Sequence, residues 1–235
     1  MGRRPDIYPH LKLWMNLSEV DQLLHIHTKM AGKKPGRKYN VEVLNKSAIV
    51  LLVACWEAFI EDLAADAFSI LLRRAKSHVS FPSKVLAEAA KPLRESVNPC
   101  DLWNLAGTGW KNVLRSHKQS LFERYIGKLN TPRPAQVDSL YESLLGIKAI
   151  STHWHWAHTS PEQARNRLDK LIDLRGSIAH RVSASHKVLK KDVRIHIDFV
   201  NRLAVQTSNA VRVALISRTK IEPWEEFEYR RKLKG

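Results

Sequence analysis

The sequence predicts an all-α fold: a helical bundle with a helical insertion in the middle of the chain. Apolar residues recur at helical spacing along almost all of the 235 residues, whereas the alternation typical of β-strands is scarce. Hydrophobic residues make up 44% of the chain and charged residues 26%, which is typical of a globular protein. A chain of this length buries a substantial core, so we expect one domain over residues 1–235.

The N-terminal part of the core is predicted to be two helices joined by a loop. The first helix spans about residues 7–31, and the second, over residues 41–76, has the broadest apolar face and should be the central core helix. Glycine, proline and lysine are concentrated in residues 32–38, which indicates an exposed turn. The predicted apolar stripe of the first helix consists of Leu13, Leu17, Val20 and Leu24, followed by His27 or Thr28.

Residues 77–159 are predicted to form the insertion, because prolines and glycines limit this stretch to short helices joined by turns. Two segments within it have helical character, residues 101–129 and residues 135–145. We expect the insertion to pack on the main bundle, whose core helices cover about residues 7–76 and 160–218.

The C-terminal part contains two more predicted helices and a tail. The first begins after Ser160, because the sequence Ser160-Pro161-Glu162-Gln163 combines a capping serine, a proline at the first helical position and a capping-box glutamine. The second spans about residues 190–218, and we expect residues 219–235 to form a basic C-terminal tail. The predicted buried stripe of the last helix includes Val193, Ile197, Val200, Ala204 and Val211.

The composition indicates a polyanionic partner and a reducing compartment. Lysine and arginine number 39 against 23 aspartates and glutamates, a formal net charge of +16, so RNA, DNA and an anionic membrane surface are the candidate partners. Cys55 and Cys100 are too few for a disulfide framework or a metal-ligand cluster. No apolar stretch is long enough to cross a bilayer, so we expect a soluble, unprocessed, cytoplasmic protein with no membrane partner.

The best candidate site is the pair Arg175 and His180, which lie five residues apart late in the chain. An arginine binds phosphate through paired, charged hydrogen bonds, and a histidine moves a proton near neutral pH. In a strongly basic protein this pair suggests chemistry on nucleic acid. Residues five apart on one straight helix are separated by about 140° and about 7.5 Å, so either the helix ends near Ala179 or a second chain completes the site.

Two segments resemble the HEPN superfamily (higher eukaryotes and prokaryotes nucleotide-binding). Residues 168–180 are similar to its signature, an arginine followed after four to six residues by a histidine. Residues 49–63, which contain Trp56-Glu57-Ala58-Phe59, resemble the Trp-Glu-x-Phe helix of its stand-alone, ribonuclease-like branch. The resemblance implies a helical bundle that dimerises through the motif helices, with two Arg/His pairs in one cleft. Many members of the superfamily cleave RNA without a metal ion, so the resemblance also implies this activity.

We therefore expect a homodimeric, metal-independent endoribonuclease with a composite active site and no cofactor. In this interpretation Arg175 holds the scissile phosphate, and His180 acts as a base on the ribose 2′-hydroxyl or as an acid on the leaving oxygen. Attack by the 2′-hydroxyl would leave a 2′,3′-cyclic phosphate. Glu57 takes part in catalysis or orients the site through a salt bridge to Arg175 or another arginine. A role in antiviral defence or as a toxin follows only from the resemblance.

Further residues refine this expectation. Basic side chains after the motif are predicted to bind the RNA backbone: Arg181, Lys187, Lys190, Lys191 and Arg194. Gly176 stands where active family members often carry a polar residue, so a non-catalytic RNA-binding or scaffold module is the alternative function. Val182 occupies the place of a tyrosine that is modified in another branch, which disfavours that toxin–antitoxin arrangement.

A rival site is the sequence His153-Trp154-His155-Trp156-Ala157-His158. Its histidines suggest zinc, as in a metal-dependent hydrolase, and its tryptophans suggest base stacking. An alternating stretch would place His153 and His155 on one face and both tryptophans on the other. We therefore favour a packed connecting segment that precedes the Ser160 cap.

Overall fold

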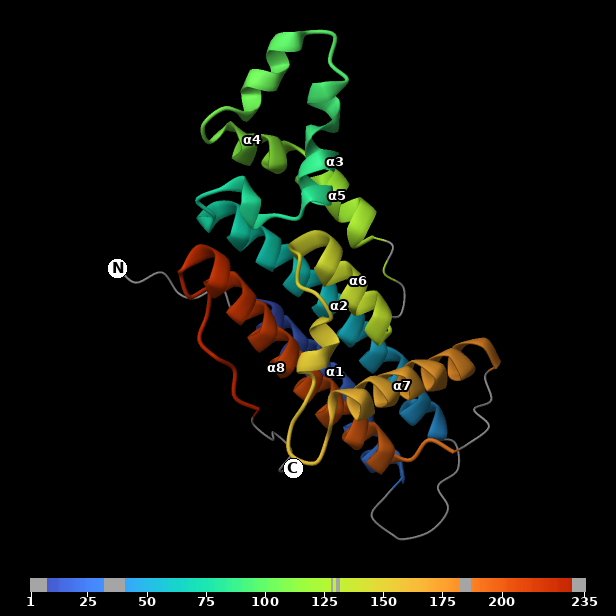
Figure 1. Cartoon of the computed structure of the whole chain (residues 1–235). Helices are drawn as coiled ribbons and strands as arrows, with labels where there is room; N and C mark the ends of the chain where they lie inside the picture. Colours follow the sequence, from blue (N-terminus) through green and yellow to red (C-terminus); the bar gives the residue numbers. More distant parts are fainter. Residues whose placement is uncertain (1–7, 32–40, 128, 130–131, 182–186, 230–235) are drawn as a thin grey trace.

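The computed structural model describes residues 8–31, 41–127, 129, 132–181 and 187–229, and the regular elements in these ranges are helices, with one isolated β-bridge (Figure 1). The predicted all-α fold is confirmed. None of the described helices is both long and apolar enough to cross a bilayer. The elements are α1 (Tyr8–Ala31), α2 (Glu42–Arg74), η1 (His78–Ser80), α3 (Ser83–Arg94), η2 (Pro99–Leu105), α4 (Gly109–Ser116), α5 (Lys118–Tyr125), α6 (Pro134–Leu145), η3 (Ile150–His153), α7 (Pro161–Arg181) and α8 (Lys190–Thr219).

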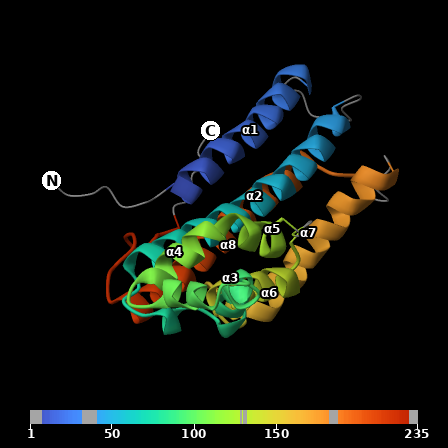
Figure 2. The ribbon, with the colours of Figure 1, turned by 90° about the horizontal axis from the view of Figure 1, so that it is seen from above.

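The core is organised around α2, as predicted. Its buried side chains lie on nearly every side of the helix and include Leu52, Trp56, Phe59, Ile60 and Leu63. A helix that is apolar all round must be covered on all sides. Helices α1, α4, α6, α7 and α8 all contact it, and Figure 2 shows α1 lying alongside α2.

The predicted stripes of the two flanking helices are also confirmed, except at the end of α1, where His27 is half-buried and Thr28 is exposed. In α1 the residues Leu13, Leu17, Val20 and Leu24 are buried. In α8 the buried residues include Val193, Ile197, Val200, Ala204 and Val211. The 3.6-residue period therefore identified the core-facing side of each helix.

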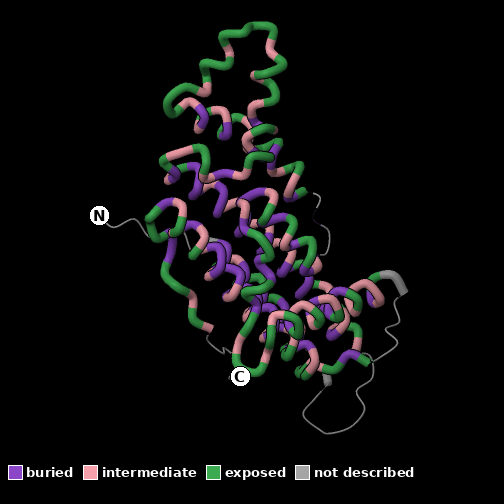
Figure 3. The backbone as a smooth tube through the Cα atoms, viewed as in Figure 1, coloured by how far each residue is buried: buried purple, intermediate pink, exposed green. Residues whose placement is uncertain are grey.

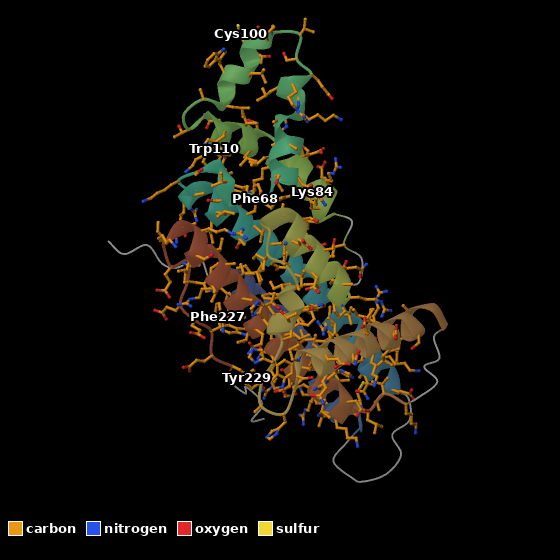
Figure 4. All side chains as sticks on the ribbon, in the orientation of Figure 1. Phe68, Lys84, Cys100, Trp110, Phe227 and Tyr229 are labelled. Carbon is orange, nitrogen blue, oxygen red and sulfur yellow. The ribbon has the colours of Figure 1, made fainter. Side chains whose placement is uncertain are left out.

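Helices α3, α4 and α5, together with η2, form an arm that projects from one end of the bundle (Figure 1), and much of its outer part is exposed (Figure 3). The base of the arm is aromatic, since the Phe68 ring of α2 meets the rings of Phe81 and Phe122 edge-on at 5.2 and 5.5 Å. Figure 4 shows Cys100 at the tip of the arm and Trp110 closer to the bundle. Residues 101–129, predicted as one helical segment, are divided between η2, α4 and α5, and Gly107 with φ +58° ends the first of these.

The second part of the predicted insertion is integrated into the bundle. The Tyr141 hydroxyl of α6 donates a hydrogen bond to the Ile60 carbonyl of α2 at 3.1 Å. Just after η3, the Trp154 indole donates to Thr207 Oγ1 of α8 at 2.9 Å and meets the Trp56 ring edge-on at 5.9 Å. These buried polar groups are therefore satisfied where α6 and the segment after η3 join the core.

Two histidines of the bundle are uncharged, the buried His10 and the half-buried His196. His10 Nε2 lies 2.7 Å from Ser208 Oγ, and its ring stacks on Phe227 with centroids 3.8 Å apart. Burial lowers the pKa of His10 to about 4. Burial also lowers the pKa of His196 to about 4, and the nearby charge of Arg167 acts in the same direction. Both imidazoles are therefore neutral in the folded protein at pH 7.

We expect the free energy of unfolding to fall as the pH drops from about 6.5 to about 4. An unfolded histidine has its ordinary pKa of about 6.5, so protons bind the unfolded chain first and the stabilisation present at neutral pH is lost. At pH 5 each histidine should contribute a loss of about 2 kcal/mol. Urea denaturation at pH 7 and pH 5 measures this loss. The variant His10→Gln should reduce it, and the exposed control His155→Gln should not; equal losses in both variants would contradict the assignment to His10.

Candidate active site

The helix that carries Arg175 begins with the predicted capping box. The backbone N–H of Gln163 donates to Ser160 Oγ at 3.2 Å, and the backbone N–H of Ser160 donates to Gln163 Oε1 at 2.9 Å. Pro161 occupies the first position of α7, where no intrahelical N–H is required. The start of α7 is therefore fixed by local sequence alone.

Arg175 lies on the buried stripe of α7. Ala164, Leu168, Leu171 and Ile178 are buried and follow one another at intervals of three, four and seven residues. Arg175 stands four residues after Leu171 and three before Ile178, so it belongs to the same face. The residue is half-buried, and its Nε atom is buried without a hydrogen-bond partner in the described part of the chain. A guanidinium is thus held where the pattern calls for an apolar side chain.

Two carboxylates of α7, those of Asp169 and Asp173, pair with an arginine other than Arg175. Arg133, just before α6, forms ion pairs with Asp169 (Nη1–Oδ1 3.1 Å) and with Asp173 (Nη2–Oδ1 2.5 Å). The hydrogen bond with Asp173 is the main reason why the pKa of Arg133 is raised. Arg175 takes part in none of the ion pairs that join described side chains. Its positive charge is therefore available to an anion from outside the described chain.

Helix α7 continues through Ala179 to Arg181, so the suggestion that it ends near Ala179 is wrong. His180 lies in the last turn of the helix, and its side chain, like that of Arg181, is outside what the structure describes. On a continuous helix the Cα atoms of Arg175 and His180 are offset by about 140° and about 7.5 Å. Completion of the site by a second chain, the other arrangement that the sequence left open, stays a prediction.

Glu57 lies on α2, which packs directly against α7. It is half-buried between the buried side chains Trp56 and Phe59. The pKa of Glu61 is raised mainly by burial, and the negative charges of Glu57 and Asp62 raise it further. The ion pairs between described residues do not include one between Glu57 and Arg175, so the role of Glu57 stays a prediction.

The cations predicted to bind RNA gather at the start of α8. Lys187, Lys191 and Arg194 are exposed, while Lys190 Nζ donates a hydrogen bond to Thr28 Oγ1 near the end of α1. The charges of Arg194 and Lys190 also reach Asp21 of α1, whose pKa is nevertheless raised because burial outweighs them. This basic cluster therefore borders α1.

The predicted rival site is a packed connecting segment. Trp154 and its hydrogen bond to Thr207 lie in the core, so this ring is not available to a base. Trp156 packs against Phe199 and the Arg202 guanidinium. His153, His155 and His158 are exposed, and no group of three or more His, Cys, Asp or Glu side chains in the described residues is placed to hold a metal ion.

The sequence analysis did not identify Arg133 as a partner of α7. Two features could have indicated it: Arg133 immediately precedes a helix-starting proline, and Asp169 and Asp173 form an i, i+4 pair of acids on α7. Neither feature specifies that α6 and α7 meet. The ion pairs form because residues that are 36 and 40 positions apart in the sequence meet in the folded chain.

Comparison with known proteins identifies the family. The family model described as RiboL-PSP-HEPN matches residues 16–212, which include α2, α7 and most of α8. No curated protein and no solved structure matches the chain.

We expect Gly176→Ala to stabilise the protein. Gly176 lies inside α7, and a Cβ atom added there meets no atom within 4 Å, so the change removes the helix cost of glycine without a clash. The free energy of unfolding should rise by about 0.5–1 kcal/mol, measured by urea denaturation. As a matched control, Gly146→Ala should destabilise, because Gly146 adopts φ +66°. An unstable Gly176→Ala variant would indicate that residue 176 is not in a regular helix.

Proposed function

The chain belongs to the RiboL-PSP-HEPN family, and we propose that it is a metal-independent endoribonuclease that acts as a homodimer. The family is linked to ribonuclease activity. The observation that carries the proposal is the half-buried guanidinium of Arg175, which has a buried Nε without a described partner and shares α7 with His180. A net charge of +16 favours binding of a polyanion such as RNA.

In the proposed reaction Arg175 binds the scissile phosphate and stabilises the negative charge that develops on its oxygens. His180 takes the proton of the ribose 2′-hydroxyl as its oxygen attacks phosphorus. The bond from phosphorus to the 5′ oxygen breaks, and that oxygen receives the proton from the imidazolium. The products are a 2′,3′-cyclic phosphate and a free 5′-hydroxyl, so the substrate must be RNA.

The remaining residues have supporting roles in this proposal. The exposed cations Lys187, Lys191 and Arg194 bind the RNA backbone together with Lys190 of the same basic cluster. We assign the same role to Arg181, whose side chain is outside the described structure. Arg133 is a positioning residue, because its ion pairs with Asp169 and Asp173 join the start of α6 to α7, the helix that carries Arg175. We assign Glu57, on the helix that packs against α7, to the orientation of the site.

A non-catalytic RNA-binding module is the second candidate function. It is favoured by Gly176, which has no side chain to assist the reaction next to Arg175. Such a module would use the same basic surfaces and would bind RNA in a salt-dependent way without cleaving it.

We expect wild-type protein to cleave RNA in excess EDTA, and His180→Ala to abolish cleavage while largely preserving RNA binding. The reason is that His180 transfers protons, whereas phosphate contacts provide most of the affinity. End-group analysis of the fragments should detect 2′,3′-cyclic phosphate. His155→Ala is the control and should remain active. Salt-sensitive binding without cleavage by the wild type would instead support the binding module.

A mixture of two inactive variants tests the composite site. If Arg175 of one chain acts with His180 of the other, heterodimers of Arg175→Ala and His180→Ala contain one intact site. Random exchange makes about half of the dimers mixed, so activity should return to about a quarter of the wild-type value. Each variant alone should stay inactive. No recovery, with dimer exchange verified by light scattering or mass spectrometry, would show that both residues act within one chain.

A further inference from the structure

A groove between α1 and α8 is closed on one side by residues 221–229, which follow α8. The cavity has a volume of about 660 Å³, within the usual range for ligand sites, and α7 contributes no residue to its lining. Figure 4 shows Phe227 and Tyr229 of this segment beside α8. The groove is thus separate from the Arg175 site.

The groove is acidic in a strongly basic protein. Its lining includes Asp21, Asp198, Glu225, Glu226 and Glu228, and the described residues contribute no lysine, arginine or histidine to it. The three glutamates are exposed and take part in none of the ion pairs between described residues. The positive charges of His25, Lys190 and Arg194 lie near Asp21 and repel a cation there. The three glutamates must therefore provide most of the attraction.

The segment that carries the glutamates is fixed to α8 through Trp224, Phe227 and Tyr229. The backbone of Phe227 exchanges two hydrogen bonds with the side chain of Asn209, at 2.9 and 3.0 Å. Arg212 Nε donates to the Trp224 carbonyl at 3.0 Å, and the Tyr229 hydroxyl donates to Asp198. The exposed glutamates lie between these anchors, so their charges are held in place before a ligand arrives.

The chemistry of the lining fits a guanidinium. Carboxylates only accept hydrogen bonds, and the lining residue Asn201 has a buried Oδ1 that lacks a partner among the described residues. Trp14, Phe227 and Tyr229 supply aromatic surface. One corner already binds such a group: Arg202 stacks on the Tyr229 ring at 3.7 Å and donates to Asp198 Oδ2 at 3.1 Å. An arginine presents donors only and stacks on aromatic rings.

We infer that this groove is a docking site for an arginine-rich segment of a partner protein. The groove is large enough for several side chains, its carboxylates follow an extended segment, and its charge is opposite to that of the chain as a whole. The inference is independent of the proposed ribonuclease activity.

The test is fluorescence anisotropy of a labelled octa-arginine peptide with the full-length protein freed of nucleic acid. The triple variant Glu225→Gln, Glu226→Gln, Glu228→Gln should weaken binding about tenfold or more, because three charge-assisted contacts are lost. The triple Glu95→Gln, Glu142→Gln, Glu162→Gln changes the net charge equally at exposed sites outside the groove and should have little effect. An octa-lysine peptide should bind more weakly than octa-arginine.

A second variant tests the inference in case the triple variant of the groove does not fold. Ser18 is exposed on α1 and lines the groove, so Ser18→Arg should block the peptide, whereas Ser47→Arg at an exposed position of α2 should not. Absence of saturable binding to the wild type would overturn the inference, as would equal weakening by both triple variants. A change of oligomeric state in Ser18→Arg with unchanged peptide affinity would place a second copy of this chain in the groove instead.

Discussion

The structure depends on one constraint: α2 is apolar on almost every side and must be covered. Helices α1, α4, α6, α7 and α8 contribute to that cover, and each turns its own apolar stripe inward. The amphipathic helix α7 is held against the core by Leu168, Leu171 and Ile178. Burial of this stripe fixes the rotation of α7, and the rotation sets the position of Arg175.

The same packing holds the Arg175 guanidinium partly out of water. A cation held partly out of water interacts more strongly with an anion than a cation on the surface does, because the local dielectric constant is lower. A neighbouring carboxylate would cancel this advantage. Asp169 and Asp173 do not do so, because they lie on another face of α7 and pair with Arg133. The buried side chains of Leu171 and Ile178, on either side of Arg175, contribute to the stability of this packing.

The sequence was sufficient for features that depend on local rules. Periodicity predicted α1, α2 and α8, the cap predicted the start of α7, and alternation predicted the burial of Trp154. It was not sufficient for contacts between distant segments. The clamp at Arg133 and the attachment of residues 221–229 to α8 depend on side chains that meet only in the folded chain. The predicted basic tail, where described, therefore includes an ordered, glutamate-rich segment.

The distribution of charge determines which ligand each surface selects. A chain with a net charge of +16 attracts RNA from a distance, yet the groove beside α8 repels it. Most of the surface repels a cationic partner. The groove attracts it, because Glu225, Glu226 and Glu228 are held in place there. Lys190 and Arg194 lie at the border between the two regions, close to Asp21. Under these two proposals, repulsion of the wrong ligand at each surface lets one small bundle discriminate between a polyanion and a cationic segment.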